Sequence, residues 1–251
     1  MNLLTAELKR SYFNYIKNIK FTLISIVFMV LILIFTVNSF INKLEMYHDF
    51  LTIFISLVFF LRLLLSSFTF PGNQINQEIK ENRIYTLSYL KSSFEHIITT
   101  RIIINNFLNL IFSVLFIILI DIALGSSFNI SIYQYFVIFV ISFLGMFSVS
   151  GIGLLVVLIG VVSGVKKIII TVAQIALFYL IFSFPSGSIF VPFSNSKVMI
   201  YNLLSNSYID FNMLWMNFLY VIINSVIFYS FSLYLSKILR LIAIKNNKLQ
   251  G

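Results

Sequence analysis

The most distinctive residue of the sequence is a single arginine inside an apolar run. Arg62 interrupts residues 50–70, a run long enough to cross a bilayer. A charge at mid-membrane costs about 2.5–3.5 kcal/mol on insertion scales, so such residues pair with polar groups or mark transport paths. Asn109 stands at a similar depth in the next run, and Asn105 and Asn106 lie one turn below it. We expect Arg62, Asn105 and Asn109 to line a translocation path or a subunit interface; snorkelling or structural pairing of Arg62 is the alternative.

The second distinctive feature is a polar segment, residues 74–101, between two apolar runs. It carries seven charged side chains: Glu78, Lys80, Glu81, Arg83, Lys91, Glu95 and Arg101. Apolar residues recur at helical spacing and form one face: Leu87, Leu90, Phe94 and Ile97. Ser92 followed by Glu95 is typical of a helix N-terminus, so we expect two helices that meet near residues 91–93. We interpret this segment, the 74–101 platform, as a cytoplasmic docking site for another protein; an ordinary solvated loop helix is the alternative.

Patterns for catalysis and metal binding are missing. The sequence has no G-x-x-x-x-G-K-[ST] loop for nucleotide phosphates and no H-E-x-x-H pair for zinc. It has no cysteine, and its two histidines, His48 and His96, fall on opposite sides of the membrane in the topology that we predict. We therefore expect a chain that is not an enzyme and that holds no metal or cofactor of its own.

The composition indicates a membrane protein. Of the 251 residues, 60% are hydrophobic and only 10% are charged, against about 25% charged residues in soluble domains. The net charge of +9 is explained by cytoplasmic segments that face anionic lipid, so no nucleic-acid partner is needed. The abundance of Asn, Ile, Lys and Phe is typical of an AT-rich genome, and on this basis we expect a bacterium.

The apolar runs predict an all-α integral membrane protein, with residues 1–251 forming a single transmembrane domain. Six runs are expected to span the bilayer: 21–40, 50–70, 102–122, 133–165, 168–184 and 212–236. Residues 1–20 space their apolar side chains three or four apart, which predicts an interfacial amphipathic helix. Residues 185–211 are too polar to span and too apolar for a free loop, so we expect a re-entrant segment there.

Proline and glycine set two further expectations. Pro71 and Gly72 disfavour helix, so the second span should end at Phe70. The 133–165 run is longer than a span needs and contains five glycines: Gly145, Gly151, Gly153, Gly160 and Gly164. Small residues let helices approach closely, so we expect this helix to be tilted or kinked and to pack tightly against a neighbour.

The basic residues predict the orientation of the chain. With both termini inside, all but three of the 17 lysines and arginines lie in cytoplasmic segments, and the exceptions are Lys43, Arg62 and Lys197. Basic residues favour the cytoplasmic side of a membrane. We therefore expect a multi-pass protein of the bacterial cytoplasmic membrane with N-in and C-in topology.

Taken together, these parts resemble the ABC-2-type permease family, the membrane subunit of ABC exporters. The opening Glu7 to Arg10 (ELKR), followed by Asn18 and Phe21, is similar to the family's connecting helix before the first span. Residues 78–87 (EIKENRIYTL) are similar to the Glu-rich platform that leads into the family's coupling helix. The later residues 95–97 (EHI) and Arg101 match its basic approach to the third span.

The resemblance implies a permease that pairs with a second copy or a paralogue and binds two separate ABC ATPase subunits, which would hold ATP and Mg²⁺. It implies ATPase-coupling contacts in the 74–101 platform, at Glu78, Glu81, Leu87, Leu90, Lys91 and Phe94. The family exports drugs, lipid-linked glycans and peptides. Because 29 Phe and 13 Tyr suit amphipathic cargo taken from the membrane, we expect export of toxic amphipathic peptides, similar to bacteriocin or phenol-soluble modulin exporters.

Other functions stay open at the level of sequence. One is a permease for hydrophobic small molecules or lipids. Another is a stand-alone membrane immunity or scaffold protein with no ATPase. A channel or a proton-driven carrier is a third, although the apolar runs lack the acidic residues of an inner proton relay.

Overall fold

The computed structural model of the chain describes residues 47–80, 94–123, 130–164, 166–184, 187–205 and 211–245, and the single positions Thr5, Lys9 and Phe13. These residues contain six helices and no strand: α2 (Tyr47–Lys80), α4 (Phe94–Ala123), α5 (Ile132–Ser163), α6 (Lys166–Ser183), α7 (Ser194–Leu204) and α8 (Phe211–Lys245). The all-helical prediction is confirmed for this part of the chain. The predicted first span, 21–40, lies outside the described residues, as does most of the predicted interfacial helix 1–20.

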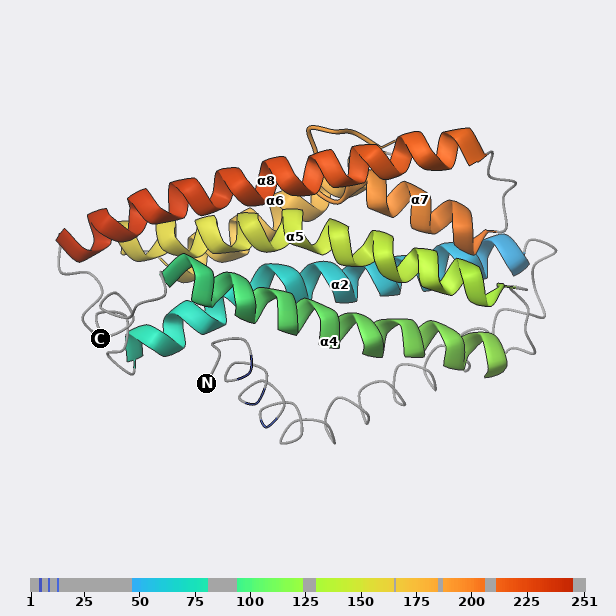
Figure 1. Ribbon diagram of the computed structural model, residues 1–251, viewed down its shortest axis with the longest axis horizontal. Helices are drawn as coiled ribbons and strands as arrows, with labels where there is room; N and C mark the ends of the chain where they lie inside the picture. The colour runs from blue at the N-terminus through green and yellow to red at the C-terminus, as the bar shows by residue number, and fades with distance from the viewer. Residues whose placement is uncertain are drawn as a thin grey trace.

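The helices form an elongated bundle around α5 (Figure 1). α5 contacts each of the other five described helices, whereas α2 and α4 pack on one side of it and α8 on another. Its residues are apolar almost throughout its length, as expected for a helix that is surrounded by neighbours. α5 ends at Gly164, whose φ of 79° closes the helix in the left-handed conformation that glycine adopts easily.

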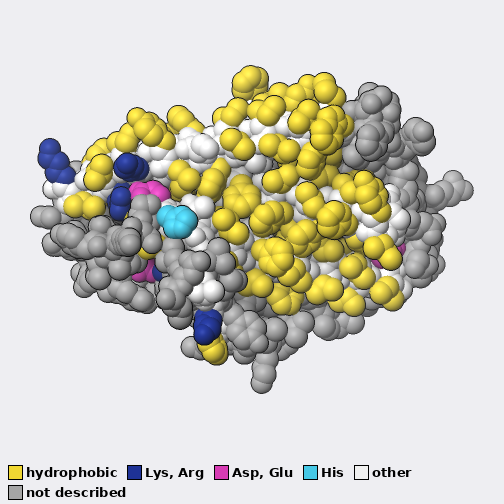
Figure 2. Space-filling model, viewed as in Figure 1, with side chains coloured by type: hydrophobic (Ala, Val, Ile, Leu, Met, Phe, Trp, Pro, Cys, Tyr) yellow, Lys and Arg dark blue, Asp and Glu magenta, His cyan; other side chains and the backbone are white. Residues whose placement is uncertain are grey.

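Four of the described helices are long and apolar enough to cross a membrane: Thr52–Ile79, Phe94–Ile122, Ile132–Ser163 and Trp215–Lys245. α6 contributes a shorter apolar stretch, Ile168–Ser183, where the fifth span was expected. Apolar side chains cover the middle of the visible surface, and most of the visible charged side chains gather at the end where α2 and α8 end (Figure 2). This distribution is that of a membrane protein.

α2 continues through its proline, so the predicted end of the second span at Phe70 is wrong. The helix includes Pro71 and runs to Lys80. Proline removes one backbone hydrogen bond and costs about 3 kcal/mol inside a soluble helix, but the last turns of α2 bury Ile75 and Ile79 against α4 and α5. This burial compensates for the lost hydrogen bond. Gly72 admits the side chain of Val157 from α5, which approaches to 2.6 Å of the position that a Cβ would take.

α8 also extends beyond its predicted end at Ser236. It continues to Lys245, through residues that were expected to form a basic tail. Ala243 is fully buried among α2, α4 and α5 side chains, which explains why the helix continues. One end of the bundle is therefore built from the end of α2, the start of α4 and the end of α8.

The prediction that α5 packs closely through its glycines is confirmed. A Cβ at Gly153 would overlap the backbone carbonyl of Phe68 in α2, and a Cβ at Gly151 would lie 3.1 Å from the backbone oxygen of Phe228 in α8. At Gly145 it would meet Ser196 of α7. Glycine thus lets α5 approach the backbones of α2 and α8 on two of its sides.

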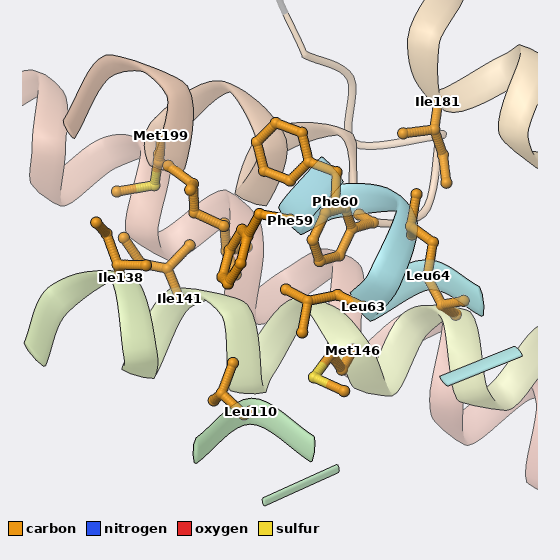
Figure 3. Packing of buried hydrophobic residues seen from close by; sticks show 14 of the residues in the cluster. Phe59, Phe60, Leu63, Leu64, Leu110, Ile138, Ile141, Met146, Ile181 and Met199 are labelled. Carbon is orange, nitrogen blue, oxygen red and sulfur yellow. The ribbon is translucent and has the colours of Figure 1, made fainter. Parts of the chain in front are cut away.

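The main apolar core lies in the half of the bundle that contains α7. It combines residues of all six described helices, ten of which are labelled in Figure 3: Phe59, Phe60, Leu63, Leu64, Leu110, Ile138, Ile141, Met146, Ile181 and Met199. Within the 185–211 segment, Ser194–Leu204 form the helix α7. This helix packs inside the bundle and contacts α2, α5 and α8.

Candidate functional site

Two facing stripes of polar side chains form the candidate site. α4 carries a polar residue every fourth position: Arg101, Asn105, Asn109 and Ser113. α2 carries a second stripe at the same spacing, interrupted only by Phe70: Arg62, Ser66, Gln74 and Glu78. Residues four apart lie on one face of a helix, and hydrogen bonds at two levels join the stripes. We call this arrangement the polar seam.

The seam begins with a buried ion pair at the charged end of the bundle. The Nη1 atom of Arg101 lies 2.6 Å from the Oε1 atom of Glu78, and the same nitrogen lies 3.4 Å from Oε1 of Gln74. The two charged side chains are only 5% and 1% exposed. Because a buried charge is costly unless it is paired, these side chains hold the ends of α2 and α4 together.

Asparagines continue the seam toward the middle of the bundle. The Nδ2 atom of Asn109 donates to Oγ of Ser66 at 2.6 Å, and Ser113 donates to the carbonyl of Asn109 at 2.9 Å. Asn105 is 9% exposed, and its buried Nδ2 atom has no hydrogen-bond partner among the described residues. A buried amide donor without a partner is unusual in a folded protein.

Arg62 lies at the far end of the seam, one turn beyond Ser66, and it is partly exposed. Asn109 joins α4 to Ser66 of α2. Arg62 and Asn105 belong to the two stripes by their helical spacing. The role of these three residues in a translocation path stays a prediction. Asn106 lies on another face of α4, where it donates to Ser150 of α5 at 3.1 Å. Sequence reasoning did not choose Ser66 or Ser150, because a serine in an apolar run carries no signal of its own.

The predicted ATPase-coupling residues divide into two groups. Glu81, Leu87, Leu90 and Lys91 lie outside the described residues. Glu78 and Phe94 are described, and both are buried: Glu78 pairs with Arg101, and Phe94 packs in the apolar cluster that also contains Ile75 and Val161. Their side chains contribute to internal packing at the base of the platform.

α8 is attached to the start of α4 by contacts that the sequence did not reveal. The Nη2 atom of Arg240 lies 2.8 Å from Oε1 of Glu95, and its guanidinium carbon lies 4.9 Å from the centre of the Phe94 ring. Three turns earlier on α8, the hydroxyl of Tyr229 lies 3.0 Å from Oγ1 of Thr99. Opposite charges at the ends of two apolar runs were visible in the sequence, but nothing in it indicated that the runs are neighbours.

The opposite end of the bundle is held by a buried lysine. Lys197 of α7 donates from Nζ to the carbonyls of Ile181 at 2.7 Å and Phe184 at 2.9 Å. These carbonyls end α6, where a cation is favoured by the helix dipole. Burial lowers the pKa of the Lys197 ammonium below its ordinary value. This lysine, counted as an outer-loop charge in the sequence, is a structural connection between α6 and α7.

Asn224 fixes the segment between α6 and α7. Its Nδ2 atom donates to the carbonyls of Ile189 at 2.7 Å and Val191 at 3.0 Å. The segment ends at Phe193, which has a φ of 63° and donates its backbone N–H to Oγ of Ser148 at 3.0 Å. Asn224 and Ser148 thus satisfy backbone groups of a buried connection, which fits a packing role for these side chains.

Comparison of the chain with family models, with curated proteins and with solved structures finds no match. The resemblance to ABC-2-type permeases therefore stays a prediction that rests on the sequence.

Proposed function

We propose that the chain is the permease subunit of an ATP-driven exporter of the ABC-2 type, and that it moves amphipathic peptides out across the cytoplasmic membrane. The proposal is supported by the four membrane-length helices and by the one charged end of the bundle (Figure 2). In this proposal, a second copy or a paralogue completes the transporter, and two separate ATPase subunits bind ATP and Mg²⁺. The chain itself supplies no nucleotide chemistry.

The single observation that carries this proposal is the ion pair between Glu78 and Arg101. The two residues precede and follow residues 81–93 of the platform in sequence, and their side chains join α2 to α4. A push on the platform by an ATPase would therefore reach both helices of the polar seam at once. Movement of α2 against α4 would open or close the seam, where Asn105, Asn109 and Arg62 offer polar contacts to a peptide.

The proposed orientation follows from the charges of the described helix ends. The end of the bundle with Glu78 also carries five basic residues of α2, α4 and α8: Lys80, Arg101, Lys237, Arg240 and Lys245. At the other end, Lys197 is the one basic residue among the described positions. Basic residues favour the cytoplasmic side, so the platform would face the ATPases.

The cargo proposal rests on the exposed surface of the helices. Large apolar and aromatic side chains are exposed on α4, α6 and α8, including Phe107, Tyr179, Phe231 and Tyr234. Such a surface lets an amphipathic peptide approach from the membrane along its apolar face, while the polar seam accommodates the opposite face. A hydrophobic small molecule would use the same surface without needing the seam.

The proposal is tested by co-expression with any ABC ATPase that is encoded next to the gene of this chain. We expect the two proteins to purify together and ATP hydrolysis to rise when a synthetic amphipathic helical peptide of Leu and Lys is added. Leu87→Asp and Leu90→Asp place a charge on the apolar face of the platform, and each should abolish either binding or stimulation. Retained binding and stimulation in both variants would refute this docking site.

A second arm tests the seam. Arg62→Ala should abolish peptide stimulation while the complex still assembles, and Arg62→Lys, which keeps the charge, should preserve part of it. Unchanged assembly and unchanged transport in Arg62→Ala would remove Arg62 from the path. If the gene has no neighbouring ATPase and no ATPase purifies with the chain, a stand-alone immunity or scaffold protein is the better description.

A further inference from the structure

We propose that the cytoplasmic end of α8 is the second element that moves with the platform, and that Arg240 and Tyr229 are the positioning residues that couple it. The proposed function assigns the platform to α2 and α4, which are its neighbours in sequence. α8 is the last helix of the chain, yet its end is attached to the first two turns of α4. We call these contacts between α8 and α4 the link. Its role in coupling to an ATPase rests on the proposed function, whereas the contacts themselves do not depend on it.

The link consists of three different contacts on one face of α8. Arg240 forms an ion pair with Glu95 at 2.8 Å and stacks over Phe94 at 4.9 Å. Tyr229 meets Thr99 at 3.0 Å. Glu95 and Thr99 are one turn apart on α4, and Tyr229 and Arg240 are three turns apart on α8, so each pair of residues shares a helix face.

Both partners of the ion pair are mostly removed from solvent. The side chains of Arg240 and Glu95 are 12% and 19% exposed, and this partial burial reduces the screening that weakens surface ion pairs. Ala243 is fully buried one turn after Arg240, in the same apolar cluster as Ile97 and Ile98. Polar contacts and apolar packing therefore act at the same place, so the end of α8 and the start of α4 form one unit.

α8 carries movement from this unit along the bundle because it packs closely on α5. Gly151 of α5 lies against Ser232 and the backbone of Phe228. Farther along, the hydroxyl of Ser225 donates to the carbonyl of Leu144 at 2.7 Å. A shift at Glu95 is thereby passed to α8 and then to the central helix, independently of the ion pair between Glu78 and Arg101.

The link is tested by measuring the distance between α4 and α8 in the purified full-length chain in lipid nanodiscs. The chain has no cysteine, so spin labels can be placed at Ile103→Cys and Leu241→Cys, both exposed apolar positions. We expect a narrow distance distribution in the parent protein. Arg240→Ala and Tyr229→Phe, each made in this background, should broaden the distribution, and the former should also lengthen the mean distance.

The control removes a charge from the same helix without touching the link. Lys237→Gln alters an exposed lysine one turn before Arg240 and should leave the distance unchanged. Because single variants can disturb folding, the exchanged pair Glu95→Arg with Arg240→Glu provides the decisive comparison: it should restore a narrow distribution. An unchanged distribution in Arg240→Ala, or no recovery in the exchanged pair, would overturn the link.

A functional arm uses the complex with the neighbouring ATPase and the same Leu and Lys peptide. Arg240→Ala should lose peptide-stimulated ATP hydrolysis while it keeps the ATPase bound, and the exchanged pair should recover the stimulation. Stimulation that is equal to the parent in Arg240→Ala would overturn the coupling role. Failure to bind any ATPase in the parent protein would instead count against the proposed function, and the distance measurement would still decide the link.

Discussion

Glu78 and Arg101 are separated by 23 positions in sequence, and their side chains meet at 2.6 Å inside the protein. Both side chains are almost completely removed from water, and Gln74 also lies 3.4 Å from Arg101. The pair therefore fixes the position of α2 relative to α4. It adds little to the free energy of unfolding compared with an apolar pair of the same size.

This relationship gives a prediction about stability. Glu78→Leu leaves the guanidinium of Arg101 buried without its carboxylate, and it should destabilise the protein by about 3–5 kcal/mol. Arg101→Met should destabilise the protein by a similar amount, because it leaves the buried carboxylate of Glu78 without the guanidinium of Arg101. The double variant Glu78→Leu with Arg101→Met replaces both charges with apolar groups, and it should recover most of the loss. Thermal unfolding of the purified proteins in one detergent measures all three.

The double variant also separates stability from function. We expect it to fold as well as the parent but to lose any transport activity, because the ends of α2 and α4 are no longer fixed in register by charge. A double variant less stable than either single variant would contradict the account of the ion pair.

Hydrophobic periodicity predicted much of the fold because membrane helices have simple sequence requirements. The runs at 102–122, 133–165 and 168–184 correspond to α4, α5 and α6, and the glycines of the second run lie where α5 approaches its neighbours. The helix ends were less predictable. The low helix propensity of Pro71 favours the end of α2 at that position, but burial of Ile75 and Ile79 beyond it stabilises the continued helix.

The candidate site was predicted only in part, for a different reason. Arg62, Asn105 and Asn109 were visible as polar residues in apolar runs, and Asn109 bonds to Ser66 across the interface between α2 and α4. The pairing of Arg240 with Glu95 was not visible, because it depends on which helices are neighbours. Lipid-facing and protein-facing apolar surfaces have similar compositions, so the sequence does not indicate that side chains of α8 reach the start of α4.

A second prediction concerns close packing at Gly153. Gly153→Ala places a methyl group against the backbone carbonyl of Phe68, which no side-chain rotation can relieve. We expect a cost of about 1–3 kcal/mol from overpacking, which outweighs a gain in helix propensity of about 1 kcal/mol. The melting temperature in detergent should fall. Ile159→Ala, at an exposed position of the same helix, should change it little; an equal fall in both variants would show that the contact with α2 is not the cause.

A third prediction concerns the pH dependence of stability through Lys197. Burial lowers its pKa below the ordinary value of 10.5. Between the lowered pKa and 10.5, the unfolded chain binds more protons than the folded one, so this lysine makes stability rise with pH in that window. Lys197→Gln keeps a donor for the carbonyls of Ile181 and Phe184 but removes the titration. We expect the melting temperature of the parent to rise relative to that of the variant as the pH approaches 10.5.

The comparison is made between parent and variant at each pH, because other lysines and tyrosines titrate in the same range and affect both proteins equally. Parallel curves for the two proteins would mean that Lys197 has the same pKa in the folded and unfolded states.

A fourth prediction concerns orientation in the membrane. Basic residues concentrate at the end of the bundle that contains Lys245, and the positive-inside rule places that end in the cytoplasm. The first turn of α5 lies at the opposite end, where Tyr133 is 64% exposed. In intact cells, a membrane-impermeant maleimide should label Tyr133→Cys, whereas Lys245→Cys should react only after the membrane is permeabilised. The parent chain contains no cysteine and serves as the unlabelled control. Labelling of Lys245→Cys from outside would invert the orientation, and the platform could then not receive force from a cytoplasmic ATPase.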